Sequence, residues 1–215
     1  MTRGISGLYA VTPDVADTPC LINAAQSALA GGARLLQYRN KSAAPALRLA
    51  QVRALLALCR KFRVPLIVND HLDLALAVNA DGLHLGADDG SLAAARARLG
   101  TARLLGASCY DRLELALEAE RLGADYVAFG SFYPSRVKPG AVRAPLALLS
   151  EARRRLSVPV VAIGGITLEN APRLIAAGAD GVAVISALFG ADDVELAARR
   201  FSALFAAREL ATRHS

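Results

Sequence analysis

The sequence predicts an α/β fold, a (β/α)₈ TIM barrel in which residues 1–215 form a single domain. Short aliphatic runs of strand length recur eight times along the chain. Each run ends at glycine or polar residues and leads into a stretch with the apolar spacing of a helix. With 215 residues, 54% of them hydrophobic, the chain is long enough to bury one large core. Repeated strand–helix units in a chain of this size are typical of such a barrel.

The stretch at residues 65–70, Pro-Leu-Ile-Val-Asn-Asp, shows this pattern most clearly. Three aliphatic residues in a row are typical of a parallel strand that is buried on both faces. The run stops at Asn69 and Asp70, an amide and a carboxylate. Both groups can hydrogen-bond a ligand and the carboxylate can bind a metal ion, so this strand end is a candidate part of a functional site.

The eight predicted strands are the runs richest in Val, Ile, Leu and Ala between turn residues. In chain order they are 8–12, 35–38, 66–68, 82–85, 104–107, 126–129, 160–163 and 182–185. The stretches between and after them have helical periodicity and predict helices over 21–30, 45–62, 72–78, 92–99, 111–122, 144–156, 168–177 and 194–211. A loop rich in Gly, Pro and Ser follows the sixth strand over 130–140.

Residues at the ends of these stretches provide helix start and stop signals. Gly31 and Gly32 follow the first predicted helix, where glycine favours termination. Pro45 is compatible with the first turn of the second helix. The run 88–91, Asp-Asp-Gly-Ser, offers capping and acidic side chains before the helix over 92–99. Gly123 stops the helix that follows.

A doubly wound open sheet is the alternative fold, because it also alternates strands with helices. Two features count against it. The chain has an eighth strand-like run, and no Gly-x-Gly-x-x-Gly turn follows the first strand. The closed barrel is therefore preferred.

Composition and charge narrow the class of protein. The chain has 25 Lys and Arg against 19 Asp and Glu, a formal net charge of +6. Much of the arginine excess lies in helical stretches such as 153–155, as expected of a solvated helix face. A positive field also attracts anionic substrates. No basic stretch is interleaved with aromatic residues and Trp is absent, which argues against a nucleic-acid partner.

We expect a cytoplasmic protein without a membrane segment. Charged residues interrupt every apolar stretch before it reaches the length of a bilayer span, and the N-terminus has no apolar signal-peptide region. Cys20, Cys59 and Cys109 are odd in number and far apart, which favours neither a disulfide framework nor a zinc site. Such cysteine usage fits a reducing compartment.

Polar residues and glycine gather at the predicted strand ends. In a TIM barrel the active site lies at the carboxyl ends of the strands. Loops meet water, so a single polar strand end would need no functional explanation. Here nearly every strand end is polar and the set is chemically coherent: Gln37, Arg39, Asn69, Asp70, Asp88, Asp89, Ser108, Ser135, Lys138, Gly164, Gly165 and Ser186.

One part of this set has the chemistry of a phosphate site. The loops after the seventh and eighth strands commonly bind phosphate in this fold, and here they carry a Gly-Gly pair and Ser186. Glycine allows backbone N–H groups to approach an anion closely, although such a pair also forms plain tight turns. Three cationic side chains add to the set: Arg39, Lys41 and Lys138.

Asp70 and Asp89 follow neighbouring predicted strands. Two carboxylates beside phosphate-binding cations favour a hard ion with oxygen ligands, namely Mg²⁺ shared with a pyrophosphate group. Helix capping explains Asp88 equally well, and two aspartates alone would not justify a metal site.

An ordered series of motifs resembles the thiamine-phosphate synthase family (thiamine phosphate pyrophosphorylase). Each motif is weak by itself, but the series follows nearly every strand from the second onward. The motifs are Gln37-Tyr38-Arg39-Asn40-Lys41, Val68-Asn69-Asp70, Asp81-Gly82-Leu83-His84-Leu85-Gly86 with Asp88-Asp89, Gly106-Ala107-Ser108, the run 130–138, Ile163-Gly164-Gly165-Ile166 and Ile185-Ser186-Ala187.

The resemblance implies a catalytic TIM barrel, a transferase of thiamine biosynthesis. Such an enzyme joins hydroxymethylpyrimidine diphosphate to thiazole phosphate and releases pyrophosphate. By the same resemblance, Asp70 and Asp89 bind Mg²⁺, and Arg39, Lys138 and Ser108 are catalytic. The implied substrate-binding residues are Gln37, Tyr38, Arg39, Asn40, Lys41, Asn69, Ser108, Ser135, Lys138, Gly165, Ile185 and Ser186.

The resemblance also divides those residues between the two substrates. Gln37, Arg39 and Lys41 would contact the pyrimidine diphosphate, with Asn69 on the pyrimidine ring. Ser108 and Lys138 would contact the diphosphate. The thiazole phosphate would be held by Ser135 and by the backbone at Gly165, Ile185 and Ser186.

The chain departs from the family at one motif. The family usually has Thr-x-Thr-Lys where this chain has Ser135-Arg136-Val137-Lys138. Val137 lacks a hydroxyl, so a hydrogen bond to phosphate worth roughly 1 kcal/mol or somewhat more would be lost. Arg136 offers a compensating charge. Ala87 also stands where the family often has Gln.

Two other functions are considered. A related thiazole tautomerase shares the barrel but needs neither diphosphate nor Mg²⁺, and a non-catalytic protein could bind thiazole phosphate. The synthase is favoured because one chain combines Asn69, Asp70, Asp89, Arg39 and Lys138. No nucleophile–base pair is evident. His84 is interpreted as a structural residue, and His71 could be either structural or functional. Apolar faces on the outer helices are compatible with a homodimer.

Overall fold

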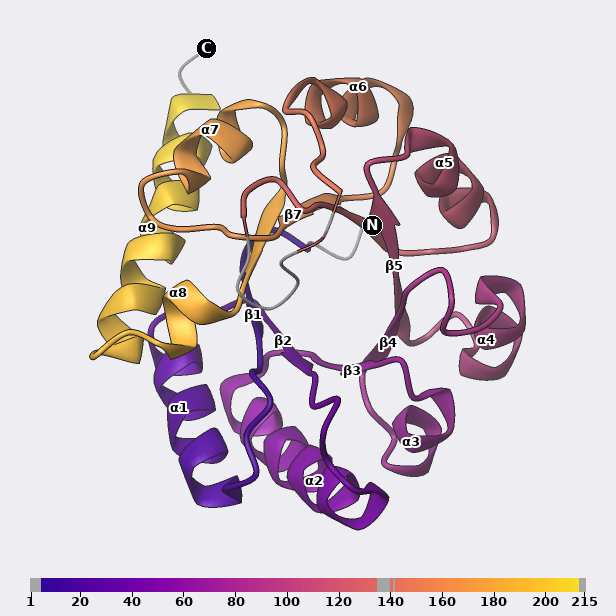
Figure 1. Cartoon of the computed structure of the whole chain (residues 1–215), viewed down its shortest axis with the longest axis vertical. Coiled ribbons are helices and arrows are strands. Elements are labelled where there is room, and N and C mark those ends of the chain that lie inside the picture. Colours follow the sequence, from indigo (N-terminus) through magenta and orange to yellow (C-terminus); the bar gives the residue numbers. More distant parts are fainter. Residues whose placement is uncertain (1–4, 135–139, 141, 213–215) are drawn as a thin grey trace.

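The computed structural model describes residues 5–134, 140 and 142–212, and these form a closed parallel barrel (Figure 1). Each strand pairs with its neighbours in chain order, and β1 pairs with β8 as well as with β2. The TIM barrel is confirmed and the open sheet is excluded, because neither β1 nor β8 is an edge. The strands are β1 Gly7–Val11, β2 Leu35–Tyr38, β3 Leu66–Asn69, β4 Gly82–Leu85, β5 Leu104–Tyr110, β6 Tyr126–Phe129, β7 Val160–Ile163 and β8 Gly181–Val184.

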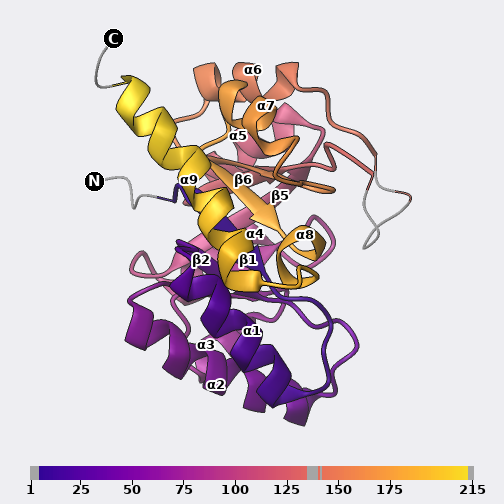
Figure 2. The same cartoon turned by 90° about the vertical axis from the view of Figure 1, so that its left-hand side faces the viewer.

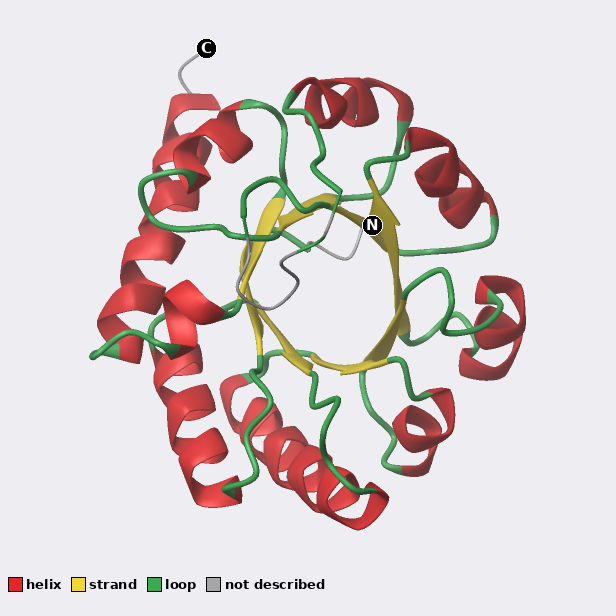
Figure 3. Cartoon of the chain, viewed as in Figure 1, coloured by secondary structure: helices red, strands yellow, loops and turns green. Residues whose placement is uncertain are grey.

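Helices surround the barrel on the outside (Figure 3). In the part of the chain that the structure describes, none is long and apolar enough to cross a bilayer. The helices are α1 Thr18–Ala30, α2 Pro45–Phe62, α3 Leu72–Ala77, α4 Leu92–Leu99, α5 Leu113–Arg121, α6 Ala147–Arg155, α7 Ala171–Ala176, α8 Ser186–Phe189 and α9 Val194–Thr212.

Alternation along the strands creates two separate apolar cores. Successive side chains of a strand point to opposite faces, so Leu36 faces the helices while Leu35 faces the barrel axis. The larger core fills the layer between strands and helices. The smaller core lies inside the barrel and includes two tyrosines, Tyr9 and Tyr126.

Several element boundaries differ from the predicted ones. The short helix α8 was not predicted, because four residues are too few to show helical periodicity. Helix α1 begins at Thr18 rather than 21, since the Asp17 side chain accepts a hydrogen bond from the Cys20 N–H. Strand β5 extends to Tyr110 with a register irregularity after Ser108. Helices α6 and α7 are shorter than predicted at both ends.

The closing helix α9 packs along α1, as Figure 2 shows from the side. Gly31 makes this close approach possible. A Cβ at this position would lie 2.4 Å from Ala198 Cβ and 2.5 Å from the Glu195 carbonyl oxygen. The predicted stop signal of the first helix therefore also serves the packing between the first and last helices.

Three aspartates repeat one hydrogen bond at the amino ends of the strands. Asp81, Asp125 and Asp180 each stand directly before a strand, and each carboxylate accepts from a backbone N–H at the first or second residue of the preceding strand. At Asp125 the acceptor distance to Leu105 N is 2.8 Å, and the Arg96 guanidinium binds the same oxygen. These contacts lie at the face of the barrel opposite the carboxyl ends, which is the face that contributes to stability rather than to chemistry in TIM barrels.

We predict that Asp125→Ala destabilises the fold by about 2 kcal/mol, because it leaves the Leu105 N–H and the Arg96 guanidinium without their shared acceptor. The matched control is Asp73→Ala, which removes the partner of Arg98 from an ion pair whose side chains are 87% and 54% exposed. That variant should lose less than about 0.5 kcal/mol. Urea unfolding compares the two, and equal losses would contradict the structural role given to Asp125.

Candidate functional site

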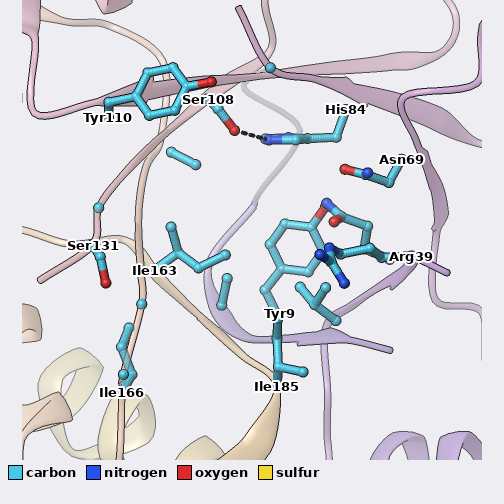
Figure 4. Close-up of a pocket in the computed structure, with 18 of the residues that line it drawn as sticks. Tyr9, Arg39, Asn69, His84, Ser108, Tyr110, Ser131, Ile163, Ile166 and Ile185 are labelled. Carbon is cyan, nitrogen blue, oxygen red and sulfur yellow. Dashed lines mark hydrogen bonds between the residues drawn. The ribbon is translucent and has the colours of Figure 1, made fainter. Parts of the chain in front are cut away.

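A cavity of about 1170 Å³ opens at the carboxyl ends of the strands. Every strand contributes at least one side chain to its lining, from Tyr9 on β1 to Ala183 on β8. This is the position of the active site in TIM-barrel enzymes. Figure 4 shows Arg39 and Asn69 on one side of the cavity and Ser131, Ile163 and Ile166 on the other.

Most of the predicted site residues meet in this cavity. Those that line it are Gln37, Arg39, Lys41, Asn69, Asp70, Asp89, Ser108, Gly165, Ile185 and Ser186. Ser135 and Lys138, with Arg136 and Val137 between them, lie outside the described residues. Their predicted roles rest on the sequence alone.

Tyr38 and Asn40 lie outside the cavity lining. Tyr38 alternates with Gln37 on β2 and faces the helices, where its hydroxyl donates to Gln51 Oε1 at 2.8 Å. The Asn40 side chain is buried and supports the loop, donating to the Val15 carbonyl at 2.9 Å and accepting from the Ala43 N–H. Both residues shape the strand end that carries Arg39 and Lys41.

Arg39 is fixed both at its backbone and at its guanidinium. Its N–H donates to the Thr12 hydroxyl at 2.8 Å, and that hydroxyl donates back to the Arg39 carbonyl. Its guanidinium contacts Asp14 Oδ1 at 3.1 Å. Asp14 also accepts from the Lys41 N–H. The arginine is thus placed at the cavity wall before any ligand arrives.

Asp70 and Asp89 face each other at the same end of the cavity. Burial, the hydrogen bond to Asp89 and the charge of Asp89 together raise the pKa of Asp70 to about 6, against the opposing charges of Lys41 and Arg39. The Lys41 Nζ lies 3.8 Å from Asp70 Oδ2. The Asp70 backbone has φ 63°, an uncommon conformation that aspartate tolerates better than most residues.

The pair of Asp70 and Asp89 fits an ion such as Mg²⁺, which takes part of its ligands from substrate and water, better than an ion that is bound by protein side chains alone. Among the described residues, no three His, Cys, Asp or Glu side chains come together as a ready-made cage. Mg²⁺ commonly takes one or two carboxylates and completes its shell with water and substrate phosphates. Two carboxylates close enough to raise the pKa of one of them would be relieved by a divalent cation.

The opposite end of the cavity is built from the loops after β7 and β8. Gly164 and Gly165 have φ 99° and 63°, which glycine adopts without strain. A Cβ on Gly165 would also lie 2.3 Å from the Pro134 carbonyl oxygen. The glycine pair is therefore required by the turn and its packing, whatever it binds. Ser186 opens the short helix α8, an element that often accompanies the phosphate site of this fold.

The barrel floor beneath the cavity carries a chain of hydrogen bonds between buried side chains. Gln37 Nε2 donates to Tyr9 Oη at 2.7 Å, and Tyr9 Oη lies 2.8 Å from Tyr126 Oη. Tyr126 Oη lies 3.1 Å from His84 Nδ1, and His84 Nε2 lies 2.9 Å from Ser108 Oγ. Figure 4 shows the last of these contacts.

Gln37 and Ser108, at the two ends of this series of hydrogen bonds, were predicted as site residues, whereas the residues between them were not. Tyr9 and Tyr126 lie inside strands that were interpreted only as apolar runs, and His84 was interpreted as structural. The available signal was alternation, since a tyrosine or histidine at an inward position of a buried strand must find a partner. No nucleophile–base pair was evident in the sequence, whereas the structure places Ser108 against His84. His71 lies outside this cavity and lines a smaller hollow with Arg48.

The fold and the cavity define a TIM-barrel enzyme with its site at the carboxyl ends of the strands. Residues 8–188 match the model of the thiamine monophosphate synthase family, and the chain belongs to that family. It is therefore an enzyme, a transferase of thiamine biosynthesis. The family and the reaction class predicted from the ordered motifs are confirmed.

Individual relatives agree with this assignment. The chain is 54% identical over 201 residues to a thiamine-phosphate synthase of Nitrosomonas eutropha, covering 94% of this chain and 95% of that protein. It is 57% identical to one of Methylobacillus flagellatus, covering 94% and 96%. A solved thiamine phosphate pyrophosphorylase of Pyrococcus furiosus superposes with a TM-score of 0.84 at 36% identity, covering 95% and 98% of the two chains.

We predict that the burial of His84 makes the folded protein less stable as the pH becomes acidic. Burial lowers the pKa of His84 to about 4, against 6.5 for an ordinary histidine. Between these pH values the unfolded chain binds more protons than the folded protein. The stability that the neutral, buried His84 contributes to the folded protein is therefore complete above pH 6.5 and is lost as the pH falls toward 4. Its full size is on the order of 3 kcal/mol.

The measurement is urea unfolding of the wild type and of His84→Gln at several pH values between 7 and 4. Other groups that titrate in this range, Asp70 among them, are common to both proteins, so the difference between the two curves isolates His84. Parallel curves would show that His84 titrates alike in the folded and unfolded chain.

Proposed function

We propose that this cavity condenses hydroxymethylpyrimidine diphosphate with thiazole phosphate to give thiamine phosphate and pyrophosphate. The observation that supports the proposal is the different chemical composition of the two ends of one cavity. Cationic and acidic side chains form one end, and the Gly164-Gly165 turn with Ser186 forms the other. Two phosphorylated substrates that react with each other would occupy such a cavity together.

The first end suits the diphosphate. Arg39 can bind two phosphate oxygens at once through its fixed guanidinium, and Lys41 supplies a mobile point charge. By family resemblance, Ser108 would contact the same substrate and Asn69 would bind its pyrimidine ring, and both residues line the cavity. Lys138 joins this group by family resemblance. As the leaving group departs, these residues neutralise its growing negative charge.

Asp70 and Asp89 are the residues that would hold Mg²⁺. When bound, the ion would neutralise charge on the leaving pyrophosphate. The two carboxylates give such a site only part of its ligands, and the remaining oxygen ligands would come from the substrate and water. Metal binding would therefore depend on the diphosphate being present.

The second end suits the thiazole phosphate. The backbone at Gly165, Ile185 and Ser186 can place N–H groups around a phosphate ester, with Ser135 added by family resemblance. Ile163 and Ile185 line the cavity and give the heterocycles an apolar surface. Holding the thiazole by its phosphate tail positions its ring nitrogen for attack.

A dissociative substitution agrees with the side chains that are present. In the family's mechanism, pyrophosphate leaves first and the thiazole nitrogen captures a pyrimidine-stabilised carbocation. Such a reaction needs charge neutralisation and positioning more than acid–base catalysis. His84 is the one described candidate base against Ser108, and its lowered pKa leaves it neutral and weakly basic at pH 7.

A thiazole tautomerase and a non-catalytic binder are the two functions that these side chains disfavour. Neither would use the paired carboxylates or Arg39, which is already oriented by Asp14. We further propose that the barrel acts as one catalytic domain in the cytoplasm, on small phosphorylated substrates and without nucleic acid. A homodimer is compatible with the apolar surface of the outer helices.

The function is tested by incubating the purified protein with both substrates, with Mg²⁺ and with a chelator. We predict release of pyrophosphate and formation of thiamine phosphate only when both substrates and Mg²⁺ are present. Isomerisation of the thiazole without diphosphate would support the tautomerase. Binding of thiazole phosphate without turnover would support the non-catalytic protein.

We predict that Asp89→Asn lowers the rate of pyrophosphate release about 100-fold at limiting Mg²⁺, because the ion loses a charged ligand. The matched control is Asp88→Asn, which removes the same charge from the next residue, a side chain outside the cavity lining. It should retain nearly full activity. Equal activity in both variants would remove Asp89 from the metal site.

A further inference from the structure

The contact between Ser108 and His84 on the barrel floor admits two opposite roles for the serine. If His84 accepts the hydroxyl hydrogen, Ser108 resembles an activated nucleophile. If His84 donates its own hydrogen, the serine hydrogen is free to bind a substrate oxygen. The distance of 2.9 Å between His84 Nε2 and Ser108 Oγ fits both roles. The remaining hydrogen bonds of the floor decide between them.

The direction of the chain is set at Gln37. Its Nε2 atom donates to Tyr9 Oη at 2.7 Å, and an amide nitrogen cannot accept. Tyr9 is only 3% exposed, so its own hydroxyl hydrogen also needs an acceptor. The Tyr126 oxygen, 2.8 Å away, is in position to be that acceptor. Were Tyr126 to donate instead, the Tyr9 hydrogen would lose this partner.

The direction continues through Tyr126 to the histidine. Once Tyr126 accepts from Tyr9, its own hydrogen points to His84 Nδ1 at 3.1 Å. A neutral imidazole has one N–H, so an accepting Nδ1 places that hydrogen on Nε2. Burial lowers the pKa of His84 and raises that of Tyr126, which keeps both groups neutral and keeps the hydrogen of Tyr126 in place.

We infer that Gln37, Tyr9, Tyr126 and His84 form a one-way chain of hydrogen bonds that makes Ser108 accept from His84 and donate its own hydrogen to an anionic oxygen of the substrate. Tyr9, Tyr126 and His84 are therefore positioning residues that act through Ser108. The inference rests on the proposed function for the identity of that anion, which would be the diphosphate. It assigns no nucleophilic role to Ser108.

The surrounding packing preserves this chain. The His84 and Tyr126 rings stack with centroids 5.6 Å apart, and Tyr9 meets Tyr126 edge-on at 5.9 Å. Gly106 leaves the space that these rings occupy. A Cβ at this position would lie 2.1 Å from Tyr126 Cζ and 2.5 Å from His84 Nδ1. Side chains from β1, β2, β4 and β6, together with the space left by Gly106, therefore fix the orientation of the Ser108 hydroxyl.

The tautomer of His84 is the direct test, and it needs no substrate. Nitrogen NMR of protein labelled with ¹⁵N-histidine distinguishes a protonated from an unprotonated ring nitrogen, and loss of a signal in His84→Gln assigns the residue. We expect the hydrogen on Nε2 in the wild type. A hydrogen on Nδ1 would overturn the inference without recourse to any variant.

Reversing the direction of these hydrogen bonds tests whether Gln37 determines the tautomer of His84. Gln37→Glu replaces the donor with a carboxylate that only accepts, so Tyr9 must now donate to Glu and the His84 hydrogen should move to Nδ1. Asn69→Asp adds the same charge on the neighbouring strand outside the chain and should leave the hydrogen on Nε2. In Gln37→Glu combined with Tyr9→Phe, the link is broken and the hydrogen should return to Nε2. An unchanged tautomer in Gln37→Glu would overturn the coupling.

Kinetics test whether the chain acts through Ser108. Tyr126→Phe keeps the ring packing and should lower kcat/KM for pyrophosphate release about tenfold, with no further loss in a Ser108→Ala background. Tyr133→Phe removes a buried hydroxyl that has no hydrogen-bond partner in the described structure, and it should be neutral. Additive losses of Tyr126→Phe and Ser108→Ala would mean that Tyr126 acts structurally. If the wild type releases no pyrophosphate, the proposed function fails while the tautomer results still decide the coupling.

Discussion

Closure of the eight strands into a barrel is the constraint on which the site depends. A closed barrel has no edge, so alternate residues of every strand must face the axis. Those near the carboxyl ends become the floor and walls of a cavity. Here the inward positions include Tyr9, Gln37, His84 and Ser108, which come from four different strands. No local segment of the chain could assemble this group, because the contacts cross the barrel.

The cavity combines rigid and adaptable electrostatics. Arg39 is fixed at its backbone by Thr12 and at its guanidinium by Asp14, so its charge is in place before binding. The carboxylates of Asp70 and Asp89 oppose each other, and a cation would stabilise both. Neutral hydrogen bonds link the floor beneath them. In a reaction that separates charge, Arg39 and a cation on the two aspartates would stabilise the leaving group, and the hydrogen-bonded floor would orient it.

The fold and most of the site could be predicted from the sequence because they depend on local signals. Aliphatic runs such as residues 66–68 mark strands, and the polar residues after them reach the same end of the barrel. Tyr38 was placed in the site because its motif was considered as a whole, whereas alternation turns it toward Gln51. The floor escaped prediction because its partners are remote, with Tyr9 and Tyr126 separated by 117 residues.

The central claim is that one cavity holds two anions at opposite ends. A crystal structure with thiamine phosphate, pyrophosphate and Mg²⁺ tests it most directly. We predict pyrophosphate beside Arg39 with the ion on Asp70 and Asp89, and the phosphate ester of the product against Gly165 and Ser186. Both anions at the same end, or pyrophosphate away from the aspartates, would contradict it.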